Sequence, residues 1–206
     1  MDILERCAPY QADKIKTILE VCQSNHSEAT LLVGDSLFNR YPMDLLKGIG
    51  EILNFGIDGA TTQTLFLILQ DIIKSNPRHI VLLVGTNDFN DEHEFDLLDV
   101  TFALFNFILR INTELPQCKV SVISPLPIDE KRQKTRARSN RLLKNLGNEY
   151  KNFENELSRV TYIDVFDSFL DDQQQLKEEY TTDGLHLSEK GYFYLNQLIK
   201  NHLILL

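Results

Sequence analysis

The sequence predicts an α/β protein with a parallel β-sheet that is covered by helices on both faces. Short runs of β-branched and aliphatic residues alternate with longer segments in which apolar residues recur at helical spacing. This alternation indicates right-handed β–α–β crossovers, and therefore parallel strands. No internal repeat, low-complexity tract or linker divides the 206 residues, a length typical of one domain. We expect residues 1–206 to form a single domain, with an N-terminal helix over about residues 10–24 packed on it.

The expected strands are apolar runs, most of which end near a glycine or a proline, as strands buried on both faces of a sheet do. They cover residues 30–33, 50–54, 79–84, 119–124 and 160–165. The expected helices carry apolar stripes. They cover residues 10–24, 65–73, 95–109, 136–157 and a C-terminal stretch that follows Ser188. The stripe of the helix over 95–109 consists of Phe95, Leu98, Phe102, Phe105 and Leu109. Because sheets of this kind bind ligands at the carboxyl ends of their strands, functional side chains should follow the strands directly.

Composition and charge exclude several classes of protein. A formal charge of -9 argues against a protein that grips nucleic acid or an anionic membrane through a broad basic face. The first eleven residues lack the apolar core of a secretory signal, and no apolar run reaches the roughly 18 residues of a membrane span. Three cysteines without a CxxC spacing fit reduced thiols. We therefore expect a cytoplasmic protein without nucleic-acid partner or stable membrane anchoring.

The first of four polar segments is Gly-Asp-Ser-Leu at residues 34–37, after the first strand. A serine on a strand-to-helix turn exposes its hydroxyl, and its own N–H lies near a helix N-terminus, where negative charge is stabilised. Ser36 can act as a nucleophile only if a base takes its proton. Taken alone, this segment also fits a turn with a helix cap.

Two further segments could supply hydrogen-bond donors to an oxyanion. Residues 54–59 follow the second strand and include Gly56, whose N–H can approach a ligand closely. Residues 85–88 follow the third strand and include Asn87, whose amide is a donor. Their structural alternatives are a turn glycine and a helix cap. Asp35 and Asp88 are expected to lie behind the site and to fix the two loops.

The fourth segment, Asp-Gly-Leu-His at residues 183–186, precedes the C-terminal helix. Asp183 lies three residues before His186 and can hold its Nδ1–H, which leaves Nε2 free as a general base. A capping aspartate beside a surface histidine is the structural alternative. Nucleophile, donors and acid–base pair nevertheless occur in order, each where this fold class exposes residues. Catalysis therefore explains the four segments better than four separate turns do.

The four segments resemble the blocks of the SGNH hydrolase superfamily, also called GDSL esterases and lipases. That family is named for the Ser, Gly, Asn and His that here are Ser36, Gly56, Asn87 and His186. Residues 84–88 and 180–187 are most similar to small bacterial acylhydrolases related to the platelet-activating-factor acetylhydrolase catalytic subunit. The resemblance implies a single SGNH hydrolase domain with a three-layer α/β/α, flavodoxin-like fold. Its parallel sheet would have five strands in the order 2-1-3-4-5.

The resemblance also implies an esterase that acts on a small-molecule acyl ester and needs no metal or organic cofactor. Ser36 would attack the carbonyl while His186 takes its proton and Asp183 orients His186. The N–H groups of Ser36 and Gly56, with the Asn87 amide, would hold the oxyanion. Acyl transfer to a sugar hydroxyl and thioester hydrolysis use the same residues, so both alternatives stay open. A non-catalytic binding module is the remote alternative.

Three features bear on the substrate and on assembly. Aromatic residues after the catalytic segments either line a short acyl pocket, which would favour acetyl esters, or belong to the core: Phe38, Tyr41, Phe55 and Phe89. A basic segment either forms a flap for an anionic substrate or, as we favour, a solvated helix face beside Asp129 and Glu130. It contains Lys131, Arg132, Lys134, Arg136, Arg138 and Arg141. A homodimer is compatible with this sequence.

Overall fold

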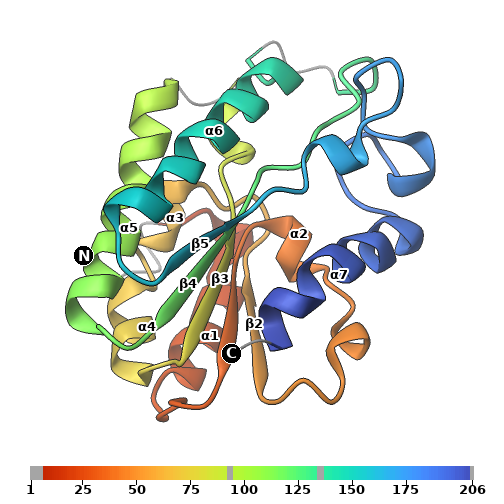
Figure 1. The fold of residues 1–206 in the computed structure, drawn as a ribbon. Helices are drawn as coiled ribbons and strands as arrows, with labels where there is room; N and C mark the ends of the chain where they lie inside the picture. The colour runs from red at the N-terminus through yellow and green to blue at the C-terminus, as the bar shows by residue number, and fades with distance from the viewer. Residues whose placement is uncertain (1–6, 92–94, 134–136, 205–206) are drawn as a thin grey trace.

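Five parallel strands form one sheet in the order β2-β1-β3-β4-β5 (Figure 1). The structure, a computed structural model, describes residues 7–91, 95–133 and 137–204. The strands are β1 (Thr30–Gly34), β2 (Ile52–Gly56), β3 (His79–Leu83), β4 (Lys119–Ile123) and β5 (Val160–Ile163). All neighbouring strands pair in parallel. The order 2-1-3-4-5 that the resemblance implies is therefore confirmed.

The helices follow the strands as the sequence predicts. They are α1 (Ala12–Val21), α2 (Ser36–Asn39), α3 (Thr62–Leu65), α4 (Leu69–Ser75), α5 (Leu97–Glu114), α6 (Asn140–Glu156) and α7 (Glu189–Ile204). Short 3-10 helices lie at η2 (Pro9–Gln11), η3 (Met43–Leu46), η4 (Asn87–Phe89), η5 (Asp167–Phe169) and η6 (Glu178–Tyr180).

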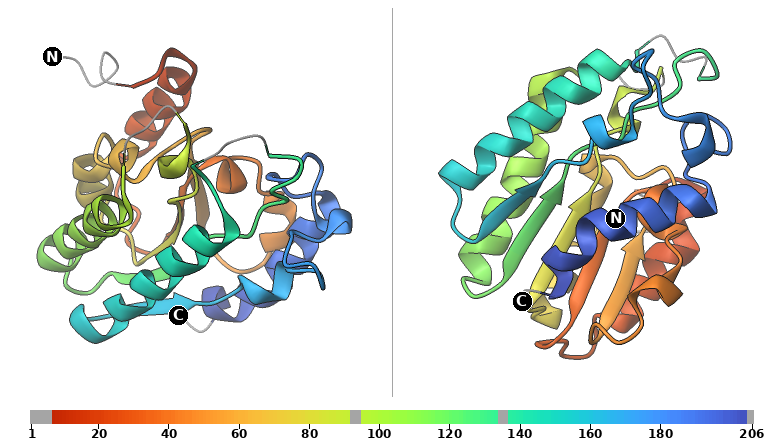
Figure 2. Two further views of the ribbon diagram at one scale, coloured as in Figure 1. Left: turned by 90° about the horizontal axis from the view of Figure 1, so that it is seen from above. Right: turned by 45° about the vertical axis from the view of Figure 1, so that its right-hand side comes forward.

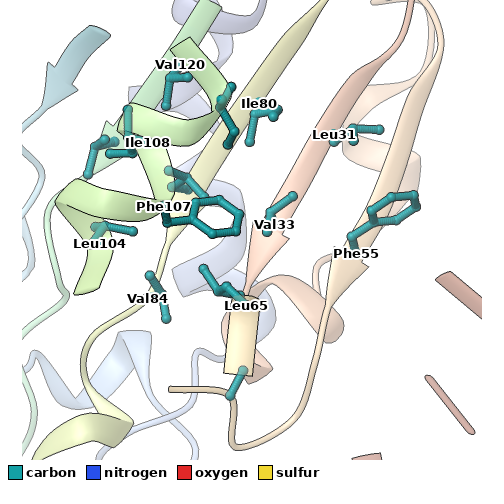
Figure 3. Close-up of a cluster of buried hydrophobic side chains, with 14 of the residues drawn as sticks. Leu31, Val33, Phe55, Leu65, Ile80, Val84, Leu104, Phe107, Ile108 and Val120 are labelled. Atoms are coloured by element: carbon teal, nitrogen blue, oxygen red, sulfur yellow. The ribbon is translucent and has the colours of Figure 1, made fainter. Parts of the chain in front are cut away.

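Side chains of the strands alternate between two apolar clusters, one on each face of the sheet. Leu31 and Val33 point to the cluster that α1, α3, α4, α5 and α6 complete, part of which Figure 3 shows. Leu32 points to the opposite cluster, which α2 and α7 complete. Helix α1 joins the first cluster through Ile15 and Ile18, both buried. The three-layer α/β/α architecture is thus confirmed.

Two helix boundaries differ from those that the sequence predicts. The single helix expected over residues 65–73 is split into α3 and α4, because Phe66 and Ile68 donate to carbonyls only three residues back, at 3.2 Å each. Such i→i+3 bonds tighten a helix and interrupt its regular path. Helix α6 begins at Asn140 and not at residue 136, because Ser139 is its N-cap and accepts the Leu142 N–H at 3.3 Å. Residue 136 lies outside the described residues.

The apolar stripe predicted on the helix over 95–109 is not the face that packs on the sheet. The buried residues of α5 are Val100, Ala103, Leu104, Phe107, Ile108 and Ile111. Leu98 and Phe102, which belong to the predicted stripe, are each 64% exposed. Helix α5 is therefore apolar on more than one side, so that periodicity alone selects the wrong face.

Loops from separate parts of the chain meet at the carboxyl edge of the sheet, which the left view of Figure 2 faces. Strand β1 lies between β2 and β3, so the segments that follow these three strands are neighbours. Gly34 ends β1 beside Leu83, and a Cβ at Gly34 would collide with the Leu83 carbonyl oxygen. Glycine is therefore required where the chain leaves β1 to enter α2.

No helix in the described part of the chain combines the length and the apolar character that crossing a membrane requires. Cys22 and Cys118 are buried free thiols.

Candidate active site

The proposed nucleophile lies at the first position of α2, immediately after β1. Asp35 is the N-cap of this short helix, and its carboxylate accepts the Leu37 N–H at 2.9 Å. This cap fixes the turn that carries Ser36, whose residue surface is 7% exposed. Within the described residues, no acceptor takes the Ser36 N–H. A backbone donor therefore lies beside the hydroxyl.

His186 connects this serine to a carboxylate on its own loop. His186 Nδ1 lies 2.6 Å from Asp183 Oδ2, and His186 Nε2 lies 3.1 Å from Ser36 Oγ. Partial burial acts to raise the pKa of Asp183, but hydrogen bonds from the His186 ring and N–H and from the Leu185 N–H outweigh it and hold the pKa at about 2. An ionised Asp183 can only accept, so it selects the Nδ1–H tautomer and leaves the Nε2 lone pair facing Ser36.

The loop that carries His186 is braced by Thr181. Thr181 Oγ1 donates to the His186 carbonyl at 2.8 Å and accepts the Gly184 N–H at the same distance. Gly184 itself has a φ of 92°, a conformation that L side chains rarely adopt. The spacing of three residues between Asp183 and His186 thus closes through a turn that needs glycine.

Asn87 begins η4, four residues beyond the last residue of β3, and a carbonyl fixes its amide. Its Nδ2 donates to the Ala60 carbonyl at 3.1 Å. Because an amide has two N–H groups, the second hydrogen is left for a ligand. The structure therefore keeps Asn87 suited to the role that the sequence predicts for it.

Gly56 does not offer the free donor that the sequence predicts. Its N–H donates to Asn54 Oδ1 at 2.9 Å, and the residue is the last of β2, inside the sheet. A Cβ at Gly56 would collide with the backbone of Phe38 and Asn39 in α2. This glycine allows α2 to pack closely on β2, and its expected oxyanion role requires correction.

Gly59 lies three residues further along the same segment. Its φ of 66° turns the chain sharply after β2, and no described residue accepts its N–H. Gly59 and Asn87 both line a hollow of about 510 Å³. The predicted segment 54–59 includes Gly59, whose N–H, unlike that of Gly56, has no acceptor among the described residues. The strand extends two residues further than its apolar run indicates, which brings Gly56 into the sheet.

Two buried carboxyl groups lie behind these loops, as predicted for Asp35 and Asp88. Asp88 accepts the Thr62 N–H at 3.0 and 3.1 Å and the Thr62 hydroxyl at 2.6 Å, so it ties the loop after β3 to the start of α3. Burial raises the pKa of Asp88 to about 6, against these hydrogen bonds. Burial raises the pKa of Asp35 to about 7, against the Leu37 N–H.

The basic segment is divided among several roles. Residues 131 and 132 form an exposed turn and not a helix face, and Arg132 Nη2 donates to the Thr182 carbonyl at 2.7 Å. Gln133 Nε2 donates to the Asp183 carbonyl at 3.0 Å, and the Asp129 N–H donates to the Gly184 carbonyl at 2.8 Å. This contact between residues 129–133 and the His186 loop was not foreseen.

The remaining cations of this segment do not form one surface. Arg141 is exposed on α6, whereas Arg138 is 7% exposed. Its Nε is buried without a partner among the described residues. Lys134 and Arg136 lie outside the described residues.

The aromatic residues considered for an acyl pocket are core residues. Phe38 and Tyr41 pack in the cluster beneath α2 and α7, and Phe55 and Phe89 pack in the opposite cluster. All four are at most 3% exposed. They cannot contact a substrate without rearrangement of the core, so the structural alternative is the correct one.

Clusters of at least three His, Cys, Asp or Glu side chains suited to a metal ion do not occur in the described parts of the chain. The contacts among Ser36, His186 and Asp183 are those of a hydrolase that transfers acyl groups.

Comparison with known proteins supports the same class of enzyme. The model of the GDSL-like Lipase/Acylhydrolase family matches residues 14–193. The chain therefore belongs to this family and is a carboxylic ester hydrolase.

Individual relatives and solved structures are similar to this chain. Platelet-activating factor acetylhydrolase IB subunit alpha2 of Rattus norvegicus is 33% identical over 174 residues, which are 79% of this chain and 70% of the relative. A Streptococcus pneumoniae protein named for platelet activating factor superposes with a TM-score of 0.83 and 29% identity, covering 95% of this chain and 93% of its own. An acetylxylan esterase from Geobacillus stearothermophilus has a TM-score of 0.68 at 19% identity, covering 87% and 95%.

Proposed function

We propose that this chain hydrolyses short-chain carboxylic esters, acetyl esters first, through an acyl-enzyme on Ser36. The observation that carries the proposal is the line of contacts from Asp183 Oδ2 through the His186 ring to Ser36 Oγ, at 2.6 and 3.1 Å. Support for acetyl esters comes from the names of the rat acetylhydrolase, which is 33% identical, and of the acetylxylan esterase that shares the fold.

In the first step Ser36 Oγ attacks the acyl carbonyl carbon, and its proton passes to His186 Nε2. Asp183 stays ionised and stabilises the imidazolium that forms. Collapse of the tetrahedral intermediate breaks the bond to the alcohol oxygen, which takes the proton from His186. Water then attacks the acyl-enzyme, gives a proton to His186, and Ser36 leaves with that proton. Carboxylic acid and alcohol are the products, and no cofactor takes part.

The oxyanion of both tetrahedral intermediates is held by three donors in this proposal. They are the N–H groups of Ser36 and Gly59 and the second amide hydrogen of Asn87. Gly59 takes the place expected of Gly56, because the Gly56 N–H is occupied by Asn54. Each donor contributes about 3 to 4 kcal/mol to lowering the barrier, which is roughly 10² to 10³ in kcat.

The deciding experiment combines a variant with covalent labelling. We expect Ser36→Ala to abolish hydrolysis of p-nitrophenyl acetate, and a serine-directed phosphonate to label Ser36 in the wild-type chain. Ser24→Ala, which changes an exposed serine, is the matched control and should keep full activity. A binding module without turnover would show no labelling and no loss in Ser36→Ala, and that result would refute the proposal.

Acyl specificity and the acceptor need separate measurements. A series of p-nitrophenyl esters of rising acyl length should show the highest kcat/KM at acetyl, and a preference for about ten carbons or more would refute short-chain specificity. Products should be analysed with a sugar alcohol present. Free acid identifies hydrolysis, whereas a new sugar ester identifies a transferase. A thioester of the same acyl group tests thioesterase activity.

The proposal also covers the oligomeric state, the cellular location and the extent of the domain. The rat relative is named as a subunit, which supports testing for a homodimer by light scattering. A cytoplasmic location and a single domain over residues 1–206 are likewise proposed. The burial of Ile15 and Ile18 in the main cluster supports including α1 in that domain.

A further inference from the structure

Helix α5 carries more apolar surface than the core uses. Its sheet-facing side is buried, yet Leu98 and Phe102, one turn apart on another side, are each 64% exposed. Adjacent large apolar side chains on a surface typically mark a place where a ligand or partner binds. Figure 1 shows α5 on the opposite side of the molecule from α7.

Three neighbouring hollows lie between this surface and the loops that carry Gly59 and Asn87. The hollow of about 510 Å³ beside Gly59 and Asn87 shares Gln63, Phe66 and Phe95 with a second hollow of about 440 Å³ over α5. The second hollow shares Phe102 with a third, of about 220 Å³, between α5 and α6. We call the path from Asn87 over Phe66 and Phe95 to Phe102 the α5 groove.

The lining of the α5 groove changes along its length. The end beside Asn87 carries hydroxyl and amide groups, among them Thr61, Thr64 and Gln63. The distal end carries aromatic and aliphatic side chains, among them Phe66, Phe102 and Leu98. A polar end next to the catalytic loops and an apolar end beyond it match an amphiphilic molecule.

The aromatic walls are held by the core, so the groove exists without a ligand. The Phe66 ring packs edge-on against buried Phe107, with ring centres 5.8 Å apart. The Phe105 ring, in the third hollow, packs in the same way on Phe153 at 5.5 Å. Preformed walls reduce the ordering cost of binding.

We propose that the α5 groove binds the hydrocarbon chain of an amphiphilic ester whose carbonyl is held at Ser36. This inference rests on the proposed hydrolysis. Acidic side chains surround the distal end, namely Asp99, Glu149 and Glu156. They repel an anionic chain end, so the chain should not end in an anionic group. The chain belongs either to the acyl arm or to the alcohol arm, and the experiment distinguishes the two.

Two ester series at monomeric concentrations identify the arm. In the first, p-nitrophenyl esters carry acyl chains of two to ten carbons; in the second, acetates carry alcohols of two to ten carbons. We expect kcat/KM to rise about two- to fourfold per methylene in one series, since full burial of one CH2 is worth a factor of about four. A rise in the acyl series would support the groove while refuting acetyl specificity. A flat response in both series overturns the inference.

A matched pair of variants locates the effect. Phe102→Gln should lower kcat/KM for the longest responsive ester roughly tenfold and leave p-nitrophenyl acetate unchanged. Phe193→Gln changes a comparable side chain, 53% exposed on α7, and should affect neither ester. If both variants behave alike, the groove does not bind the chain. A homodimer that becomes monomeric in Phe102→Gln, with chain-length dependence intact, would show that a second copy covers this face and would overturn the inference.

Calorimetry separates the groove from the chemistry. The Ser36→Ala chain should bind the eight-carbon ester of the responsive series, octyl acetate or p-nitrophenyl octanoate, with a negative heat-capacity change. It should bind the two-carbon ester of the same series at least tenfold more weakly. Phe102→Gln in the same background should abolish this difference. If wild-type chain hydrolyses no ester but this binding is found, the proposed function fails and the groove stands. Equal binding of the two members of that series refutes the groove even where hydrolysis is intact.

Discussion

Replacing Asp35 by asparagine should stabilise the protein at neutral pH and leave it unchanged in acid. Asp35 is 2% exposed and accepts the Leu37 N–H. Burial raises its pKa to about 7; Leu37 and Arg138 oppose the rise, while Asp88 and Asp58 add to it. Asparagine accepts the same N–H through its amide oxygen and is as good an N-cap, so Asp35→Asn keeps the cap and removes the charge.

The sign follows from proton binding in the two states. The unfolded chain releases the Asp35 proton above pH 3.8, whereas the folded chain keeps it up to about pH 7. Between these values the folded state binds more protons, so the free energy of unfolding falls as pH rises and levels off above pH 7. A difference of one between the folded and unfolded pKa is worth about 1.4 kcal/mol, so the free energy of unfolding falls by roughly 4 kcal/mol in all. Of this, about 3 kcal/mol is lost between pH 5 and pH 8.

Urea unfolding of both chains at pH 4, 5, 6, 7 and 8 measures this difference. The advantage of Asp35→Asn should grow with pH and reach roughly 4 kcal/mol at pH 8. Asp44→Asn, at a side chain that is 84% exposed, is the control and should give a curve parallel to wild type. Asp35→Ala, which leaves the Leu37 N–H without its acceptor, should cost about 1 kcal/mol relative to Asp35→Asn and lower kcat. If the free energy of unfolding depends on pH in the same way in Asp35→Asn and in wild type, Asp35 does not have a raised pKa in the folded chain.

Three further predictions concern the catalytic loops. Asp183→Asn should lower kcat about 10⁴-fold, because an amide no longer selects the Nδ1–H tautomer of His186. The free energy of unfolding in urea should change little. An unchanged kcat would exclude Asp183 from the triad. Asn87→Ala should lower kcat about 10²- to 10³-fold with KM nearly constant, and a change in KM alone would assign Asn87 to substrate binding. Arg132→Met keeps the side-chain stem but removes the hydrogen bond to the Thr182 carbonyl, so kcat should fall severalfold. The control Arg141→Met should leave kcat unchanged. Equal kcat values in the two variants would show that this hydrogen bond does not position the His186 loop.

The fold follows from the sequence because buried parallel strands are continuous apolar runs. The runs at 30–33 and 79–84 became β1 and β3 almost residue for residue. Helix faces were harder to assign, because α5 is apolar on more than one side and periodicity does not show which side meets the sheet. The break between α3 and α4 was also hidden, since the buried stripe from Leu65 to Ile72 continues across it.

The site follows from the sequence only in part. Ser36, Asp183 and His186 could be singled out because each lies close in sequence to a strand end or to another candidate residue, and the structure brings these three into contact. The choice between Gly56 and Gly59 depended on where β2 ends, and apolar runs locate strand ends poorly. The contacts of Arg132 and Gln133 with carbonyls fifty residues away have no local pattern and could not be predicted.

One structural unit connects the oxyanion donors to the α5 groove. The chain from Gly59 through α3 to Phe66 begins at a proposed oxyanion donor and ends at a wall of the groove. Asp88 holds the start of α3 through Thr62 and is the immediate neighbour of Asn87. A hydrocarbon chain that packs on Phe66 therefore acts on the same segment that aligns both donors. Binding energy from a remote part of a substrate raises kcat when it improves alignment in the transition state. We accordingly expect chain length to raise kcat as well as to lower KM, and we expect Asp88→Ala, which releases α3 from Asn87, to abolish the gain in kcat while KM still responds to chain length.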